Sequence, residues 1–123
     1  MKYLMLLTNP TERVEAWEKL SSDEAQRLRE EELPKWGAFM QWAEEKGIQL
    51  DGLELDSPRT AKAVREAGGS VAVTDGPFPE TKEVIGGYFL AECDDLDQAI
   101  DIASRIPIAE TGSVEIRPLV GEN

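Results

Sequence analysis

Two short segments that are apolar on both faces limit the fold of this chain more than any other feature. Residues 3–7 and residues 84–91 have the apolar content of strands but lack the polar alternation of a strand with one face in water. Both faces of the sheet that holds them must therefore be covered. A single layer of helices covers only one face, so we expect a second copy of the chain to pack on the other.

A long amphipathic helix is predicted between these strands. Ser21 and Glu24 have the spacing of a capping box, which marks the start of a helix. Pro34 lies inside the helical pattern, where a proline removes one backbone donor and crowds the preceding turn, so we expect a break near Glu32 or Leu33. The pattern places four apolar side chains in one buried stripe: Trp36, Phe39, Met40 and Ala43.

A second helix is predicted after residues 84–91, where an acidic cluster suits the positive end of a helix dipole. Its expected buried stripe consists of Leu96, Ala99, Ile100 and Ala103. Residues 60–66 and 70–74 flank two glycines and predict a hairpin, whereas residues 48–58 are interpreted as an irregular connection. Residues 113–119 alternate and predict a final strand.

The order of these elements predicts a single α+β domain over residues 1–123. It matches the ferredoxin-like plan, in which two helices lie on one face of an antiparallel sheet. A length of 123 residues with 41% hydrophobic residues suffices for one core without a metal or a disulfide. Together with the two-sided strands, this plan predicts a homodimer.

Charge and residue usage disfavour several classes of function. The chain carries 25 acidic and 13 basic side chains, a net charge of -12, which disfavours binding to nucleic acid or to an acidic membrane surface. It has no histidine, so no step can rely on a histidine base or ligand, and Cys93 is its one cysteine. We therefore expect no metal and no cofactor. The absence of an export signal or a long apolar run predicts a cytoplasmic protein.

Several sequence strings carry a resemblance to a known family. Residues 74–83 read TDGPFPETKE, residues 86–88 read GGY, residues 94–99 read DDLDQA and residues 112–118 read GSVEIRP. Together with the N-terminal MKYLMLL they resemble the DGPF-domain proteins of the YCII-related superfamily, and the resemblance spans nearly the whole chain. It implies a dimeric α+β barrel, in which two sheets face each other around a cavity, and so agrees with the homodimer expected from the two-sided strands.

The resemblance also carries expectations about function. The superfamily includes members proposed to act on small ring compounds through a His-Asp pair, which this chain cannot form because it has no histidine. Members of the DGPF branch resemble proteins associated with extracytoplasmic-function sigma factors, which implies a regulatory or accessory role. The resemblance therefore leaves open whether the protein is an enzyme.

Glu115 and Arg117 form the main candidate site. They alternate with Val114 and Ile116, so if the two apolar side chains face the helices, the charged pair points into the cavity between two sheets. The guanidinium of an arginine is always charged and matches a carboxylate, either that of Glu115 or that of a ligand. The alternative is a structural ion pair at the dimer interface.

Three further residues complete the candidate ligand-binding set. Tyr88 follows two glycines and either offers its phenol to a ligand or packs in the core with a polar tip. Asp75 precedes a Gly-Pro pair, which is typical of a tight turn, and the alternative is a ligand contact. Glu83 ends a charged segment, residues 80–83, that is either a solvated loop or a polar rim of the cavity.

Two functions are consistent with these residues. The first is the binding of a small anionic or carbonyl-bearing molecule in a cavity of the homodimer, where any proton transfer falls to Tyr88 or to a carboxylate such as Asp75 or Glu83. The second is an accessory role with a basic partner, because a net charge of -12 attracts basic surfaces over long distances. A sigma factor is the partner that the resemblance implies.

Overall fold

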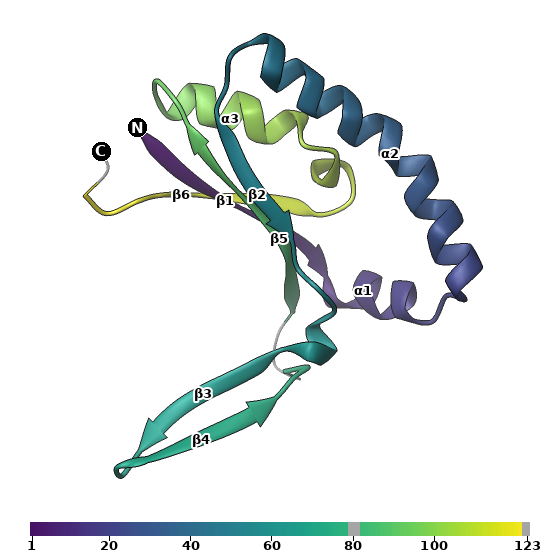
Figure 1. The fold of residues 1–123 in the computed structure, drawn as a ribbon, viewed down its shortest axis with the longest axis vertical. Helices are drawn as coiled ribbons and strands as arrows, with labels where there is room; N and C mark the ends of the chain where they lie inside the picture. Colours follow the sequence, from purple (N-terminus) through teal and green to yellow (C-terminus); the bar gives the residue numbers. More distant parts are fainter. Residues whose placement is uncertain (79–81, 122–123) are drawn as a thin grey trace.

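The computed structural model describes residues 1–78 and 82–121, and its centre is a four-stranded antiparallel sheet (Figure 1). The strands follow the order β2–β5–β1–β6. Their bounds are Leu50–Glu54 for β2, Glu83–Glu92 for β5, Lys2–Pro10 for β1 and Ser113–Pro118 for β6. β1 and β5 occupy the two central positions, so each pairs with a neighbouring strand along both of its edges.

Two long helices cover one face of this sheet (Figure 1). They are α2 (Ser22–Glu45) and α3 (Leu96–Arg105), and the shorter α1 (Thr11–Glu18) joins β1 to α2. The order β1–α2–β2–β5–α3–β6, with antiparallel neighbours throughout, is the ferredoxin-like arrangement. The predicted α+β fold is confirmed, whereas the barrel of two facing sheets stays a prediction because one chain is described.

The hydrophobic core lies between the sheet and the two long helices. On β1, Tyr3, Met5 and Leu7 are buried in it. Val114 and Ile116 of β6 pack against the same core, as the alternation predicted. The intervening residues of each strand therefore belong to the opposite face of the sheet, because successive side chains of a strand point to opposite sides.

α2 is one continuous helix, so the predicted break near Glu32 or Leu33 is wrong. The predicted capping box forms, with Ser21 Oγ accepting a hydrogen bond from the Glu24 backbone N–H at 3.2 Å. Pro34 forfeits one backbone hydrogen bond, but it is exposed and lies between a capped start and a C-terminal half that buries Phe39 and Ala43. Those contacts hold the residues on both sides of the proline in one helix.

The buried stripes of the two long helices differ from the prediction at particular positions. Four predicted core residues are buried: Phe39, Ala43, Ala99 and Ala103. Met40 of α2 is exposed instead, and so are Leu96 and Ile100 of α3, while Ile102 of α3 is fully buried. The sequence of α3 allows two overlapping apolar stripes. The stripe that runs through Ile102 continues into buried Ile106 after the helix and so buries more apolar surface.

Two elements were not predicted from the sequence, namely α1 and β2. Residues 48–58 contain β2, so their interpretation as an irregular connection is wrong. A Cβ atom at Gly52 would lie 2.1 Å from the Tyr88 carbonyl oxygen, so only glycine permits the close pairing of β2 with β5. The glycine that suggested an irregular segment is thus what allows the strand to form.

The predicted hairpin forms, but it stands apart from the main sheet. Within the described residues, β3 (Lys62–Ala67) and β4 (Ser70–Asp75) pair with each other alone. Gly68 and Gly69 join them with φ angles of 58° and 81°, which favour glycine. Figure 1 shows the hairpin extending from the lower end of the sheet, on the side away from α2 and α3. Two 3-10 helices complete the fold, η1 (Pro58–Thr60) and η2 (Pro107–Glu110).

Candidate functional site

Three of the predicted site residues lie on the uncovered face of the main sheet. Glu115 pairs with Leu6, and Leu6 pairs with Tyr88, so these three residues form one row across β6, β1 and β5. Arg117 lies in the next row on this face, opposite Leu4. The structure therefore brings the phenol and the charged pair to one face, where leucines of β1 separate them.

Glu115 and Arg117 form an ion pair within one strand. Arg117 Nη1 lies 3.3 Å from Glu115 Oε2, and both side chains are more than half exposed in the single chain. An exposed pair of this kind contributes about 0–1 kcal/mol to stability. The pair is therefore accessible to a ligand or to a second copy of the chain.

Asp75 and Glu83 do not join that row. Asp75 is the last residue of β4, and its Oδ1 accepts a hydrogen bond from Lys62 Nζ across the hairpin at 2.7 Å. The Gly76 N–H donates at 2.8 Å to the carbonyl that precedes β3, which closes the base of the hairpin just after Asp75. Glu83 is the exposed first residue of β5. Residues 80 and 81 of the predicted polar rim lie outside the described residues.

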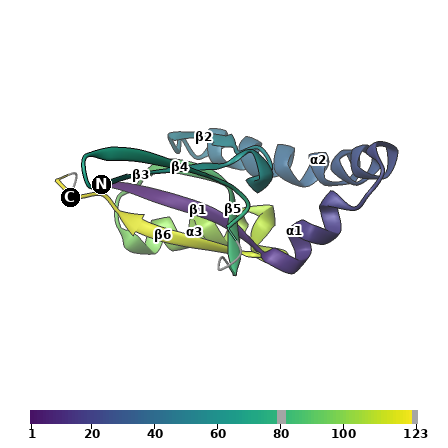
Figure 2. The ribbon, with the colours of Figure 1, turned by 90° about the horizontal axis from the view of Figure 1, so that it is seen from below.

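A wide groove lies elsewhere in the chain. Figures 1 and 2 both show the N-terminal half of α2 extending past the sheet toward α1. The groove opens between these two helices, β2 and the first half of β5, and its volume is about 1140 Å³. Its walls are mainly apolar and include Trp17, Leu20, Leu28, Leu33, Trp36 and Phe89. Tyr88 of the predicted site is also among the lining residues.

An ion pair between α2 and β2 fixes one edge of the groove. Arg29 donates from Nη2 and Nη1 to the two carboxylate oxygens of Glu54, at 2.9 Å and 3.3 Å, in a forked arrangement. These hydrogen bonds raise the pKa of Arg29 above its ordinary value. The same guanidinium lies 5.5 Å from the ring centroid of Trp17. Arg29 thus links α1, α2 and β2.

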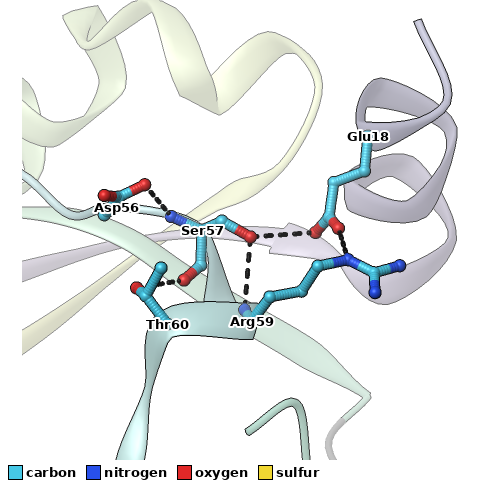
Figure 3. A network of polar contacts seen from close by, with 5 residues as sticks. All are labelled: Glu18, Asp56, Ser57, Arg59 and Thr60. Atoms are coloured by element: carbon cyan, nitrogen blue, oxygen red, sulfur yellow. Dashed lines mark hydrogen bonds and ion pairs between the residues drawn. The ribbon is translucent and has the colours of Figure 1, made fainter.

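A second polar network links α1 to η1, the segment that leads into the hairpin (Figure 3). Glu18 accepts hydrogen bonds from Arg59 Nε and, at 3.4 Å, from Ser57 Oγ. Ser57 Oγ also accepts from the Arg59 backbone N–H at 3.2 Å, and Asp56 accepts from the Ser57 backbone N–H at 2.6 Å. Thr60 Oγ1 donates to the Ser57 carbonyl at 2.7 Å. The network fixes the base of the hairpin relative to α1.

Arg13 is a cation of the groove without a counter-ion among the residues that the structure describes, whereas Arg29 and Arg59 are both paired. It lies four residues before Trp17 on α1, and both residues line the groove. The i,i+4 spacing places the two side chains on one face of the helix. One wall of the groove therefore combines a large aromatic surface with an unpaired positive charge.

Sequence reasoning missed this groove because its walls come from segments whose packing the sequence did not fix. The predicted α2 stripe starts at Trp36, yet apolar residues at helical spacing continue toward the N-terminus through Leu28 and Ala25. When the apolar stripe of a helix is longer than the sheet that it covers, the remaining apolar residues must contact another part of the protein or a ligand. This is the signal in the sequence that could have indicated the groove. The opposite wall of the groove is formed by α1. Because α1 was not predicted from the sequence, the extended apolar stripe alone did not indicate a groove.

The burial of Cys93 leads to a prediction about the reactivity of its thiol. Cys93 is buried, and burial, followed by the nearby carboxylates, raises the pKa of its thiol. Since the thiolate is the reactive form, we expect alkylation by iodoacetamide near pH 8 to be at least about tenfold slower in the native protein than in urea. Mass spectrometry over time measures both rates. Equal rates would contradict the burial of this thiol.

Two observations on the described residues concern membranes and metals. Among residues 1–78 and 82–121, no helix is long and apolar enough to cross a membrane. In the same part of the chain, no group of three or more cysteine, aspartate or glutamate side chains has the arrangement of a metal site.

Comparison with known proteins adds a family and a relative. Residues 1–122 match the model of the YCII-related domain. A segment of 65 residues is 48% identical to an uncharacterized protein of Rhizobium meliloti (strain 1021) and covers 50% of this chain and 52% of that protein. The chain therefore matches about half the length of this curated relative.

Proposed function

The chain belongs to the YCII-related family, and from the geometry of its groove we propose that it binds a small amphipathic acid, with an aromatic or acyl body and an anionic end. The family match confirms the resemblance carried by TDGPFPETKE and the other strings. It names no ligand, so the proposal rests on the groove between α1, α2 and the sheet.

The single observation that carries the proposal is the size and lining of this groove. Ligand pockets have volumes of about 300–1000 Å³ and combine apolar walls with a few placed polar groups. A volume of about 1140 Å³ lies just above that range. Trp17 and Trp36 supply flat apolar surface, which suits an aromatic or acyl body.

Arg13 favours an anion at one end of the ligand, in a groove that is also lined by Arg29, Arg59 and four carboxylates: Glu18, Glu32, Glu54 and Asp56. Glu54 and Glu18 are each paired with an arginine, so they present no uncompensated negative charge to an acid. Arg13 has no counter-ion among residues 1–78 and 82–121, so its guanidinium can donate to a ligand carboxylate. The uncovered sheet face also offers a cation, Arg117, but in the single chain it is an exposed surface without a wall opposite. The groove therefore supports a small-molecule site better than the sheet face does.

We expect Arg13→Ala to weaken the binding of an aromatic anion at least about tenfold, since a charged hydrogen bond contributes about 1.5–3 kcal/mol. The probe is 8-anilinonaphthalene-1-sulfonate, titrated by fluorescence. Arg27→Ala is the matched control, because Arg27 is an exposed arginine of α2 that does not line the groove. This control should change the dissociation constant less than twofold.

A competition experiment separates the contribution of the acidic group to binding from that of the apolar body. Decanoate should displace the probe more strongly than decanol in the unmodified protein, and the difference should vanish in Arg13→Ala. Equal competition by the two compounds in the unmodified protein would show that the site does not select acids. If neither displaces the probe and native mass spectrometry detects no complex, the groove is not a ligand site.

A further inference from the structure

We infer that the side-chain amide of Asn9 and the guanidinium of Arg13 together bind the carboxylate of the ligand, at the end of the groove where β1 passes into α1. The inference rests on the proposed function, because it needs an acid in the groove. It adds a second residue to the acid site and gives the direction in which the ligand lies.

Asn9 lines the groove from the end of β1. Leu7, two residues earlier on the same side of the strand, lines it as well. On β5, the residue paired with Asn9 is Val84, which is also a lining residue. The pairing of β1 with β6 ends at Thr8 and Ser113, so Asn9 lies just beyond this ladder. Asn9 thus places a polar side chain between apolar residues of the groove.

The side-chain oxygen of Asn9 has no hydrogen-bond partner in the described part of the chain, although it is buried. Gly112 lies beside it, since a Cβ atom there would be 2.8 Å from Asn9 Oδ1, but the Gly112 N–H already donates to the Ile108 carbonyl oxygen at 2.7 Å. Buried polar groups are nearly always paired, and an unpaired one costs free energy. Folding alone therefore does not explain an amide at this position.

The Nδ2 group is the part of this amide that a ligand can reach, because Oδ1 is inaccessible. It carries two N–H donors, and neither donates to residues 1–78 or 82–121. A hydrogen bond from such a donor to a carboxylate is charge-assisted and stronger than one to a neutral oxygen. Asn9 therefore offers the groove a donor that favours an acid.

Arg13 belongs to the same end of the groove. β1 ends at Pro10 and α1 begins at Thr11, so three residues separate Asn9 from Arg13, and both line the groove (Figure 1). α1 begins without a side-chain cap, and the positive end of its dipole lies at this junction. The guanidinium can donate to both oxygens of a carboxylate, which leaves lone pairs for the amide.

The carboxylates of the groove give the direction of the ligand. Glu18 is the last residue of α1 and belongs, with Asp56, to the network at η1 (Figure 3). A helix of eight residues is about 12 Å long, so this network lies about one helix length from the start of α1. The other two groove carboxylates are ion-paired on α2 and β2, namely Glu32 and Glu54. An acid at the β1–α1 junction avoids the network, and its apolar body then extends toward Trp17.

The test measures an acid and the matching alcohol in parallel on the full chain. Dissociation constants of decanoate and decanol come from displacement of 8-anilinonaphthalene-1-sulfonate, corrected for the affinity of each variant for the probe. We expect Asn9→Ala to weaken decanoate at least about tenfold and decanol less than about twofold. Gln41→Ala is the matched control, because it removes an exposed amide of α2 that does not line the groove. It should change both constants less than about twofold.

A combined variant shows whether the two residues bind the same carboxylate. In the Arg13→Ala background, Asn9→Ala should weaken decanoate less than about threefold, because the acid is no longer held next to the amide. Independent losses, about 100-fold in the double variant, would mean that the two residues act on different groups and would overturn the inference.

Thermal unfolding without ligand separates a ligand-binding amide from a structural one. Asn9→Val replaces the amide with an apolar side chain of similar size that suits a strand, so it should raise the melting temperature by at least about 2 °C. A lowered melting temperature would assign Asn9 a structural role and overturn the inference. If the valine variant does not fold, the binding data of Asn9→Ala decide.

Failure of this inference is distinct from failure of the proposed function. Unchanged decanoate binding in Asn9→Ala, or equal weakening of decanoate and decanol, would overturn the role of Asn9 while the effect of Arg13→Ala still supported an acid in the groove. Loss of the preference for decanoate in the unmodified protein would instead overturn the proposed function, and the inference with it.

Discussion

Replacing Ile102 with alanine is expected to lower the free energy of unfolding by about 2–5 kcal/mol. Ile102 of α3 is fully buried in the core that also contains Met5 and Ile106. Truncation removes apolar contacts and leaves a cavity that the close-packed neighbours do not fill. Domains of this size are stabilised by about 5–15 kcal/mol in total, so urea denaturation will show a large shift of the midpoint.

Ile100→Ala is the matched control for this prediction. Ile100 has the same side chain on the same helix, but it is 50% exposed. Its truncation should change the free energy of unfolding by about 0.5 kcal/mol or less, as is usual for surface positions. Equal losses in the two variants would contradict the observed core and would favour the stripe predicted from the sequence.

Gly112→Ala is expected to cost about 1–3 kcal/mol or more, although it adds a single methyl group. A Cβ atom at Gly112 would lie 2.0 Å from the Thr8 carbonyl oxygen and 2.8 Å from Asn9 Oδ1. Because the nearer atom belongs to the backbone of β1, the main chain itself must shift. Gly112 opens the GSVEIRP string, and its contact with β1 gives that glycine a structural role. Thermal and urea unfolding measure the loss.

Gly37→Ala is the opposite case and serves as the control. Gly37 lies inside α2, and a Cβ atom there would meet nothing within 4 Å. Alanine at such a position should stabilise the protein by about 0.5–1 kcal/mol, because glycine loses more conformational freedom in a helix. If both substitutions have the same sign, the contact at Gly112 does not decide its effect.

Several parts of the fold could be predicted because local patterns specify them. The capping box of Ser21 and Glu24 predicted the start of α2, and Gly68 with Gly69 predicted the hairpin turn. The same local reasoning failed at Pro34, where packing of the flanking residues keeps the helix continuous. It also failed for β2, because the close approach of Gly52 to β5 is a contact between distant segments.

For the candidate site too, local patterns placed some residues correctly, whereas the positions of others depend on tertiary structure. Alternation along β6 correctly placed Glu115 and Arg117 on the face away from Val114 and Ile116. Whether that pair binds a ligand or a second copy stays a prediction, because it needs a surface opposite. Asp75 could not be placed from the sequence, since its position depends on a hairpin that leaves the main sheet.

By itself, the sequence determined the α+β class, the central strands, the family and the residues that share a strand face, because these depend on periodicity, capping and motifs within short segments. Only the tertiary structure decided which α3 stripe is buried, where the hairpin stands, and that α1 and α2 enclose a groove lined by Arg13, which has no counter-ion in the described part of the chain. These features depend on competition between alternative packings of distant segments. The free energy of that competition comes from the total surface buried, which no local pattern contains.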